Sequence, residues 1–149
     1  MKILIVTSSG GHLFKTFQLK PWWSKYERVW VTKKDEFSES ILNGEKIIPG
    51  NFPEQRNILN FFKNLFFALK LLRTEKPDLI FSMGAGIAPP FFLVAKLYKI
   101  KTVFIETFIS ISQSTISGKM IYPLADLFLV QNKKLLHVYK KSLYLGPIL

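Results

Sequence analysis

The chain has 149 residues, is 48% apolar and carries a formal net charge of +11. This length suits one domain, residues 1–149, and the apolar fraction excludes a disordered or fibrous protein. Cysteine is absent, which excludes a disulfide framework and a thiolate metal site, and we expect no metal. The excess of 21 Lys and Arg over 10 Asp and Glu favours an anionic partner: nucleic acid, anionic lipid or a phosphorylated ligand.

Short apolar runs alternate with helical segments along the chain. In order, we expect strand 2–6, helix 12–19 ended by Pro21, strand 28–32, helix 37–42, strand 46–48, helix 57–75, strand 79–81, a helix with Pro89 and Pro90 near its start, strand 102–105, a helical segment 117–124 interrupted by Pro123, strand 127–130, helix 133–139 and strand 143–145. This alternation implies βαβ units. We therefore predict an α/β fold, a Rossmann-like parallel sheet with helices on both faces.

The loop Thr7-Ser8-Ser9-Gly10-Gly11-His12 joins the first strand to the first helix. A glycine loop at a helix N-terminus lets backbone N–H groups approach an anion, and the helix dipole favours negative charge there. The loop has neither the third glycine of a dinucleotide fingerprint nor the Gly-Lys-Ser/Thr of a P-loop. His12 titrates near neutral pH. The alternative is that the glycines serve only the turn and that His12 is a capping or structural residue.

Two further segments follow predicted strands, at the sheet edge where parallel sheets bind ligands. The turn Ser82-Met83-Gly84-Ala85-Gly86 is either a backbone cradle for phosphate and sugar hydroxyls or a place of close helix packing. Glu106 ends a buried strand, where a carboxylate is costly unless it is paired or exposed. It is a candidate sugar-hydroxyl acceptor, general base or ion-pair partner. Asp126, before another buried strand, is expected to brace a loop.

Aromatic residues and lysines are mixed in several segments. Within residues 60–73 one apolar stripe forms at helical spacing, and it comprises Phe62, Leu65, Phe66, Leu69 and Leu72. Rings that enter the headgroup region and cations that meet anionic lipid predict contact with an anionic membrane surface, through Trp22, Trp23, Phe62, Phe66, Lys63 and Lys70. The alternative for the stripe is a core helix. No recognised nucleic-acid motif occurs, so we expect no nucleic-acid partner.

Targeting signals are not evident in the sequence. Met1-Lys2 runs directly into the first strand, and no apolar segment reaches the roughly 18–20 residues that span a bilayer. We therefore expect a cytoplasmic protein that is peripheral to a membrane.

Four stretches resemble one protein family. They are Ser8-Ser9-Gly10-Gly11-His12-Leu13, Met83-Gly84-Ala85-Gly86, Phe104-Ile105-Glu106-Thr107-Phe108 and the long block from Ser117 to Gln131. They resemble the PssD/CpsF-type proteins of bacterial exopolysaccharide and capsule synthesis. That family also contains the membrane-anchoring subunit of the split UDP-GlcNAc transferase of dolichol-linked oligosaccharide synthesis. The likeness runs from Lys2 to Gly146.

The resemblance implies the N-terminal, acceptor-side half of a GT-B glycosyltransferase such as MurG. It implies a small donor-binding partner subunit that holds a UDP-sugar, a polyprenyl-diphosphate-linked saccharide as acceptor, and a place on the cytoplasmic face of the plasma membrane. We expect no cofactor on this chain. By the same resemblance the acceptor diphosphate is bound by Ser9, Gly10, Gly11, Gly84 and Gly86. The base of an inverting transfer is then His12 or Glu106.

Two other functions stay open at this point. One is a non-catalytic membrane scaffold for the donor-binding partner. The other is a free-standing nucleotide-binding Rossmann enzyme, against which the incomplete dinucleotide fingerprint argues.

Overall fold

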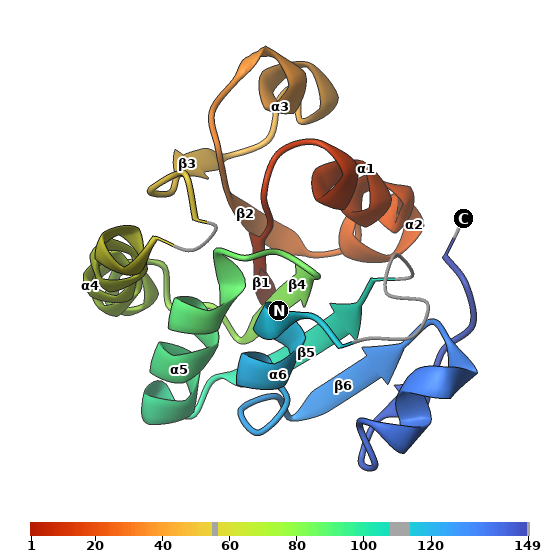
Figure 1. Ribbon diagram of the computed structural model, residues 1–149. Helices are drawn as coiled ribbons and strands as arrows, with labels where there is room; N and C mark the ends of the chain where they lie inside the picture. The colour runs from red at the N-terminus through yellow and green to blue at the C-terminus, as the bar shows by residue number, and fades with distance from the viewer. Residues whose placement is uncertain (55–56, 108–113, 149) are drawn as a thin grey trace.

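The computed structural model describes residues 1–54, 57–107 and 114–148, and Phe108 of the third motif therefore lies outside the described residues. Over these residues the strands form one seven-stranded sheet of order β3-β2-β1-β4-β5-β6-β7, and every pairing is parallel (Figure 1). The elements are β1 Lys2–Val6, α1 Gly11–Gln18, α2 Lys20–Trp23, β2 Glu27–Thr32, α3 Glu36–Ile41, β3 Ile47–Pro49, α4 Ile58–Glu75, β4 Leu79–Met83, α5 Ala88–Tyr98, β5 Lys101–Glu106, α6 Ile116–Ile121, β6 Leu127–Val130, the 3₁₀ helix η1 Lys133–His137 and β7 Leu143–Tyr144.

Strand β1 contributes to the hydrophobic core on both faces of the sheet. Leu4 and Val6 pack with buried residues of α4, α5 and α6, whereas Ile3 and Ile5 pack with α1 and α2. In Figure 1 the first group of helices lies on the opposite side of the sheet from α1, α2 and α3. Burial on both faces explains why β1 is apolar at every position after Lys2. The predicted Rossmann-like α/β fold is confirmed.

Two helical segments differ from the sequence-based expectation. Pro21 does not end the helical region, because it lies in the first turn of α2, where a missing N–H loses no intrahelical bond. The segment after Asn132 forms the 3₁₀ helix η1 rather than an α-helix. The loop-bracing role of Asp126 is confirmed, since its Oδ2 accepts from the backbone N–H of Thr102 at 2.9 Å.

Helix α4 turns a partly polar side toward the rest of the protein. Asn64 and Asn60 are both buried on that side. The Oδ1 of Asn64 accepts from the backbone N–H of Asn51 at 2.9 Å, and its Nδ2 donates to the Asn51 carbonyl at 3.0 Å. The Nδ2 of Asn60 donates to the Pro53 carbonyl at 2.8 Å. The two asparagines therefore hold the segment 51–53 against the helix.

The aromatic side of α4 faces away from the core. Phe62 and Phe66 are 51% and 69% exposed, which excludes the core-helix alternative for these two residues. Lys63 and Lys70 are exposed on the same helix. None of the helices in the described part of the chain is long and apolar enough to cross a membrane.

The two tryptophans of α2 do not extend this surface. Trp23 is completely buried, its Nε1 donates to the Thr16 carbonyl at 3.0 Å, and its ring packs edge-on against Trp30. The predicted membrane contact of Trp23 is therefore wrong, because its ring fills the core beneath α1 and α2. Trp22 is half-buried with its ring centre 5.1 Å from that of Phe81. Moreover, α2 and α4 cover opposite faces of the sheet (Figure 1).

Candidate functional site

The candidate site lies where the strand order reverses. Strand β1 pairs with β2 on one side and with β4 on the other, and the loops after β1 and β4 leave the sheet at its carboxyl edge. In doubly wound sheets this point is the usual ligand-binding position. The first predicted glycine loop and the second both lie here.

The N-terminus of α1 is open toward solvent. Gly10 is the residue before the helix, with φ +85°, and no side chain caps the first turn. A Cβ placed on Gly10 or on Gly11 would meet no atom within 4 Å, so the space above the helix end is free. Uncapped N–H groups at the positive end of a helix bind anions. This geometry fits the anion site that the sequence predicts at these two glycines.

A cavity of about 370 Å³ opens beside this helix end, and we call it the glycine-loop cavity. It is lined by Ser8, Ser9, Gly10, His12, Lys33, Asp35, Phe52 and Glu54. Asp35 links the first glycine loop to the start of α3. Its Oδ1 accepts from the backbone N–H of Ser38 at 3.0 Å and from Ser9 Oγ at 2.9 Å. The Ser38 N–H bond, followed by the Ser9 hydroxyl, lowers the pKa of Asp35. Lys33 Nζ lies 3.8 Å from Asp35 Oδ2 and adds a cation to the cavity.

His12 lines the glycine-loop cavity with a half-buried imidazole. Burial is the main cause that lowers its pKa, and the charge of Lys15 adds to this effect. The Met83 carbonyl and the Glu54 carboxylate act in the opposite direction. The Nδ1 atom is buried and has no hydrogen-bond partner among the described residues. A lowered pKa makes the neutral imidazole the dominant form at neutral pH.

The two glycines of the second loop are close-packed. A Cβ on Gly84, where φ is +70°, would lie 2.3 Å from Thr107 Cγ2 and 3.0 Å from His12 Cε1. A Cβ on Gly86 would lie 2.8 Å from Glu54 Cγ. Close packing, the alternative that the sequence left open, therefore explains both glycines. Gly84 is buried and offers no open cradle, whereas Gly86 reaches the surface of a neighbouring cavity.

Glu106 does not face either cavity. It is 0% exposed, and the hydroxyl of Thr115 lies 3.0 Å from both of its carboxylate oxygens. The hydroxyl of Tyr139 donates to Oε2 at 3.0 Å, and a Cβ on Gly118 would collide with the same oxygen. Burial raises the pKa of Glu106 despite these donors. Its predicted role as a base or as a ligand for a sugar hydroxyl is contradicted by this position, since its oxygens lie enclosed beneath α6.

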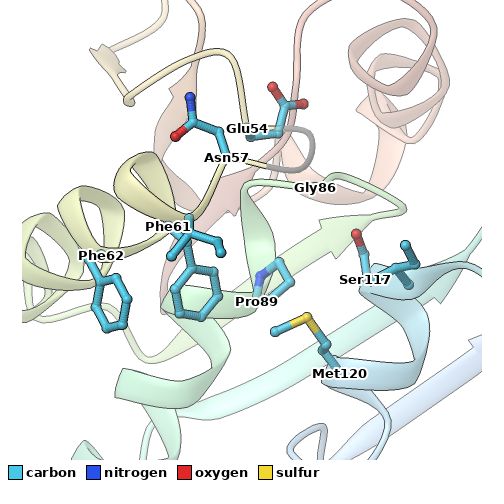
Figure 2. Close-up of a pocket in the computed structure, with 10 residues that line it drawn as sticks. Glu54, Asn57, Phe61, Phe62, Gly86, Pro89, Ser117 and Met120 are labelled. Atoms are coloured by element: carbon cyan, nitrogen blue, oxygen red, sulfur yellow. The ribbon is translucent and has the colours of Figure 1, made fainter.

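A second cavity, of about 750 Å³, lies between α4, α5 and α6, and we call it the apolar cavity. Figure 2 shows Phe61, Phe62, Pro89 and Met120 around its lower part, with Glu54 and Asn57 at its upper side. Ile58, Ile116, Ser117 and Gly86 complete the lining. The cavity thus combines an extended apolar wall with one polar end.

Glu54 is the functional candidate that the sequence did not reveal. It lines both cavities and lies against Gly86. In the sequence it follows Pro53, with no strand end or glycine pair beside it, so no local pattern marks it. The one sequence feature that could have drawn attention to it is a lone acidic residue close before the cap Asn57 in a strongly basic chain.

The fold matches the N-terminal half of GT-B glycosyltransferases such as MurG, and it also matches UDP-N-acetylglucosamine 2-epimerases. The crystal structure of Acinetobacter baumannii MurG matches with a TM-score of 0.73 and 15% sequence identity, over 89% of this chain and 42% of the MurG chain. At that identity the likeness shows the fold.

The chain belongs to the family described as oligosaccharide biosynthesis protein Alg14 like, whose model matches residues 51–148. It is 25% identical, over 180 residues, to the UDP-N-acetylglucosamine transferase subunit ALG14 of Mus musculus, covering 99% of this chain and 83% of the relative. It is 26% identical, over 125 residues, to a UDP-N-acetylglucosamine--N-acetylmuramyl-(pentapeptide) pyrophosphoryl-undecaprenol N-acetylglucosamine transferase of Blochmanniella floridana, covering 70% of this chain and 33% of the relative. The chain is thus an Alg14-like protein related to MurG-type transferases, and it spans less than half of the MurG-type chains that it matches.

Proposed function

We propose that this chain is the acceptor-binding and membrane-recruiting subunit of a two-component glycosyltransferase. The enzyme transfers a sugar from a UDP-sugar to a polyprenyl-diphosphate-linked saccharide. The observation that carries the proposal is the uncapped N-terminus of α1 opening into the glycine-loop cavity, in an Alg14-like chain that matches less than half of a MurG chain. The names of the relatives supply the donor class and, for the MurG-type transferase, an acceptor in which a pyrophosphoryl group links sugar and polyprenol.

The glycine-loop cavity suits the polar part of such an acceptor. The N–H groups at the start of α1 and the ammonium of Lys33 favour a diphosphate. The ring of Phe52 gives an apolar surface for the C–H face of a sugar. The volume of about 370 Å³ falls in the range of small-ligand sites.

The outer sides of α4, α5 and α6 suit a membrane surface. Exposed apolar side chains gather on these three neighbouring helices, and they are Ile58, Leu59, Phe62, Phe66, Leu93, Leu97, Ile116 and Met120. Exposed Lys63, Lys70 and Lys96 accompany them. Apolar groups with flanking cations bind the interface of anionic bilayers. We place this surface on the cytoplasmic face of the plasma membrane, in peripheral contact.

The donor side of the reaction belongs to a separate subunit in this proposal. The partner is a small chain that resembles the C-terminal half of a GT-B enzyme, holds the UDP-sugar and closes over the carboxyl edge of the sheet. The transfer inverts the anomeric centre, the subunit described here is inactive alone, and it carries no cofactor. On the resemblance to PssD/CpsF-type proteins, the product enters exopolysaccharide or capsule synthesis.

Reconstitution tests the proposal. The chain is co-purified with a candidate donor-lobe subunit and supplied with radiolabelled UDP-N-acetylglucosamine and polyprenyl-diphosphate-N-acetylglucosamine in vesicles of phosphatidylglycerol and phosphatidylcholine. We expect labelled lipid only when both subunits are present. Transfer by the donor-lobe subunit alone, or by this chain alone, would contradict the two-component arrangement. The scaffold alternative requires full transfer when His12 is replaced by alanine.

A further inference from the structure

We infer that Glu54 is the catalytic base of the transfer, the group that takes the proton from the attacking hydroxyl of the acceptor. This inference rests on the proposed function. It replaces Glu106, whose carboxylate is enclosed beneath α6. The observation behind the inference is the position of Glu54, which lines both cavities and shares the glycine-loop cavity with the open end of α1.

The acidic residues around the site differ in how their carboxylates are engaged. Asp35 accepts from the Ser38 N–H and from Ser9 Oγ through its Oδ1, and its Oδ2 lies 3.8 Å from Lys33 Nζ. Glu106 accepts from Thr115 and Tyr139 in the interior. Among the described residues, no hydrogen bond or ion pair engages the carboxylate of Glu54. A general base needs a basic lone pair within reach of the substrate. Hydrogen bonds lower the pKa of Asp35, and Glu106 is enclosed, so among the described residues Glu54 is the best placed of the three.

The fold fixes the position of Glu54 from two sides. The buried amides of Asn60 and Asn64 hold the preceding residues through the carbonyls of Pro53 and Asn51. On the other side, Glu54 packs against Gly86: a Cβ at residue 86 would lie 2.8 Å from Glu54 Cγ, so only glycine leaves room for this side chain. Helix α4 and the loop after β4 therefore place one carboxylate between them. These contacts distinguish Glu54 from an acidic residue on the surface that is only solvated.

The neighbours of Glu54 fit a sugar hydroxyl between them. Glu54 and His12 both line the glycine-loop cavity, and the negative charge of Glu54 acts to raise the pKa of His12. His12 is mostly neutral at neutral pH, because burial lowers its pKa, so it offers a polar contact without competing as a cation for the carboxylate. Among the residues that the structure describes, the other charged groups near this pair are Lys15, Lys33 and Asp35.

The transfer step balances with Glu54 as base. The hydroxyl oxygen of the acceptor forms a bond to the anomeric carbon of the donor sugar from the face opposite the leaving group. The bond between that carbon and the diphosphate oxygen breaks, and the nucleoside diphosphate leaves with the electron pair. The hydroxyl proton passes to the carboxylate of Glu54, which releases it to water afterwards.

The test uses the two-subunit complex and three variants. Glu54→Gln keeps the shape and removes the basic oxygen, Glu54→Asp keeps a carboxylate on a shorter arm, and Glu36→Gln on exposed α3 is the matched control. We expect Glu54→Gln to lower kcat by about 100-fold or more with the acceptor KM unchanged, as for loss of a general base. Glu54→Asp should recover part of that loss, and Glu36→Gln should behave like the wild type.

An unchanged kcat in Glu54→Gln would overturn the inference. If the acceptor KM then falls, the carboxylate only repels the diphosphate. If His12→Gln instead loses kcat, His12 is the base. Absence of transfer by the wild-type complex would instead contradict the proposed function itself.

An independent measurement on this chain alone checks the geometry without any turnover. In a histidine NMR titration, Glu54→Gln should lower the pKa of His12 further, because the Glu54 charge raises it. Glu36→Gln should leave the His12 titration unchanged. Equal titration curves in the wild type and in Glu54→Gln would show that the carboxylate does not face the imidazole, and would remove the structural basis of the inference.

Discussion

The imidazole of His12 lies directly over Gly84: a Cβ on that glycine would be 3.0 Å from His12 Cε1 and 3.1 Å from Nδ1. Two loops that are more than seventy residues apart in sequence thus fit together because one of them has no side chain. The contact orients the histidine that faces the glycine-loop cavity.

Gly84→Ala is expected to destabilise the protein by about 2–4 kcal/mol, because a left-handed backbone conformation and a collision with Thr107 add together. Chemical denaturation measures the free energy of unfolding. Gly44→Ala is the matched control, since Gly44 has φ +81° but open space around it, so only the backbone cost of about 1–2 kcal/mol remains. Equal losses in the two variants would contradict the contact.

The stability of the protein should depend on the protonation of His12. Burial lowers the folded-state pKa of His12 below its ordinary value of 6.5. The unfolded chain therefore binds the proton more readily, and this contribution to stability is fully present above pH 6.5 and is lost as the pH falls through the folded-state pKa. His12→Gln should flatten this part of the curve of unfolding free energy against pH. If His12→Gln left this curve unchanged, the imidazole of His12 would be solvated in the folded protein rather than partly buried.

Tyr139→Phe is expected to cost about 1–3 kcal/mol of unfolding free energy, because the buried Glu106 carboxylate loses a hydrogen-bond donor. Denaturant unfolding measures the loss. Tyr144→Phe removes a hydroxyl from an exposed ring on β7 and should change stability by less than about 0.5 kcal/mol. If Tyr139→Phe were equally neutral, Glu106 would not depend on this bond for its place beneath α6.

Replacing both Phe62 and Phe66 with serine should reduce binding to phosphatidylglycerol vesicles by about tenfold or more, since each ring contributes apolar area to the interface. Vesicle sedimentation measures the partitioning. The unfolding free energy should change little, because both side chains are largely exposed. Phe37→Ser, at a 43% exposed ring on α3 on the other side of the sheet, is the control. Equal binding by the double variant and the wild type would exclude α4 as the membrane contact.

The sequence predicted the strands and helices well, because the alternation of apolar runs and helical segments can be read from neighbouring residues. Apolar runs such as Ile3-Leu4-Ile5-Val6 alternate with helical segments, and such runs are stable only when helices cover both faces of a parallel sheet. The place of the opening glycine loop between strand and helix likewise predicted its position at the carboxyl edge of the sheet. These features determined the fold and one half of the candidate site.

The partners of individual side chains were decided only by the tertiary structure. Sequence pattern assigned Trp23 to a membrane surface and Glu106 to the site, yet both are buried by contacts with residues that no local pattern pairs with them. Glu54 reaches the cavities because α4 asparagines and Gly86, on separate elements, leave it one position. Burial and hydrogen bonding of a side chain depend on what packs against it. The sequence by itself therefore determined which elements form and which loops lie at the carboxyl edge of the sheet, whereas the packing of distant elements decided which carboxylate lines the cavities there.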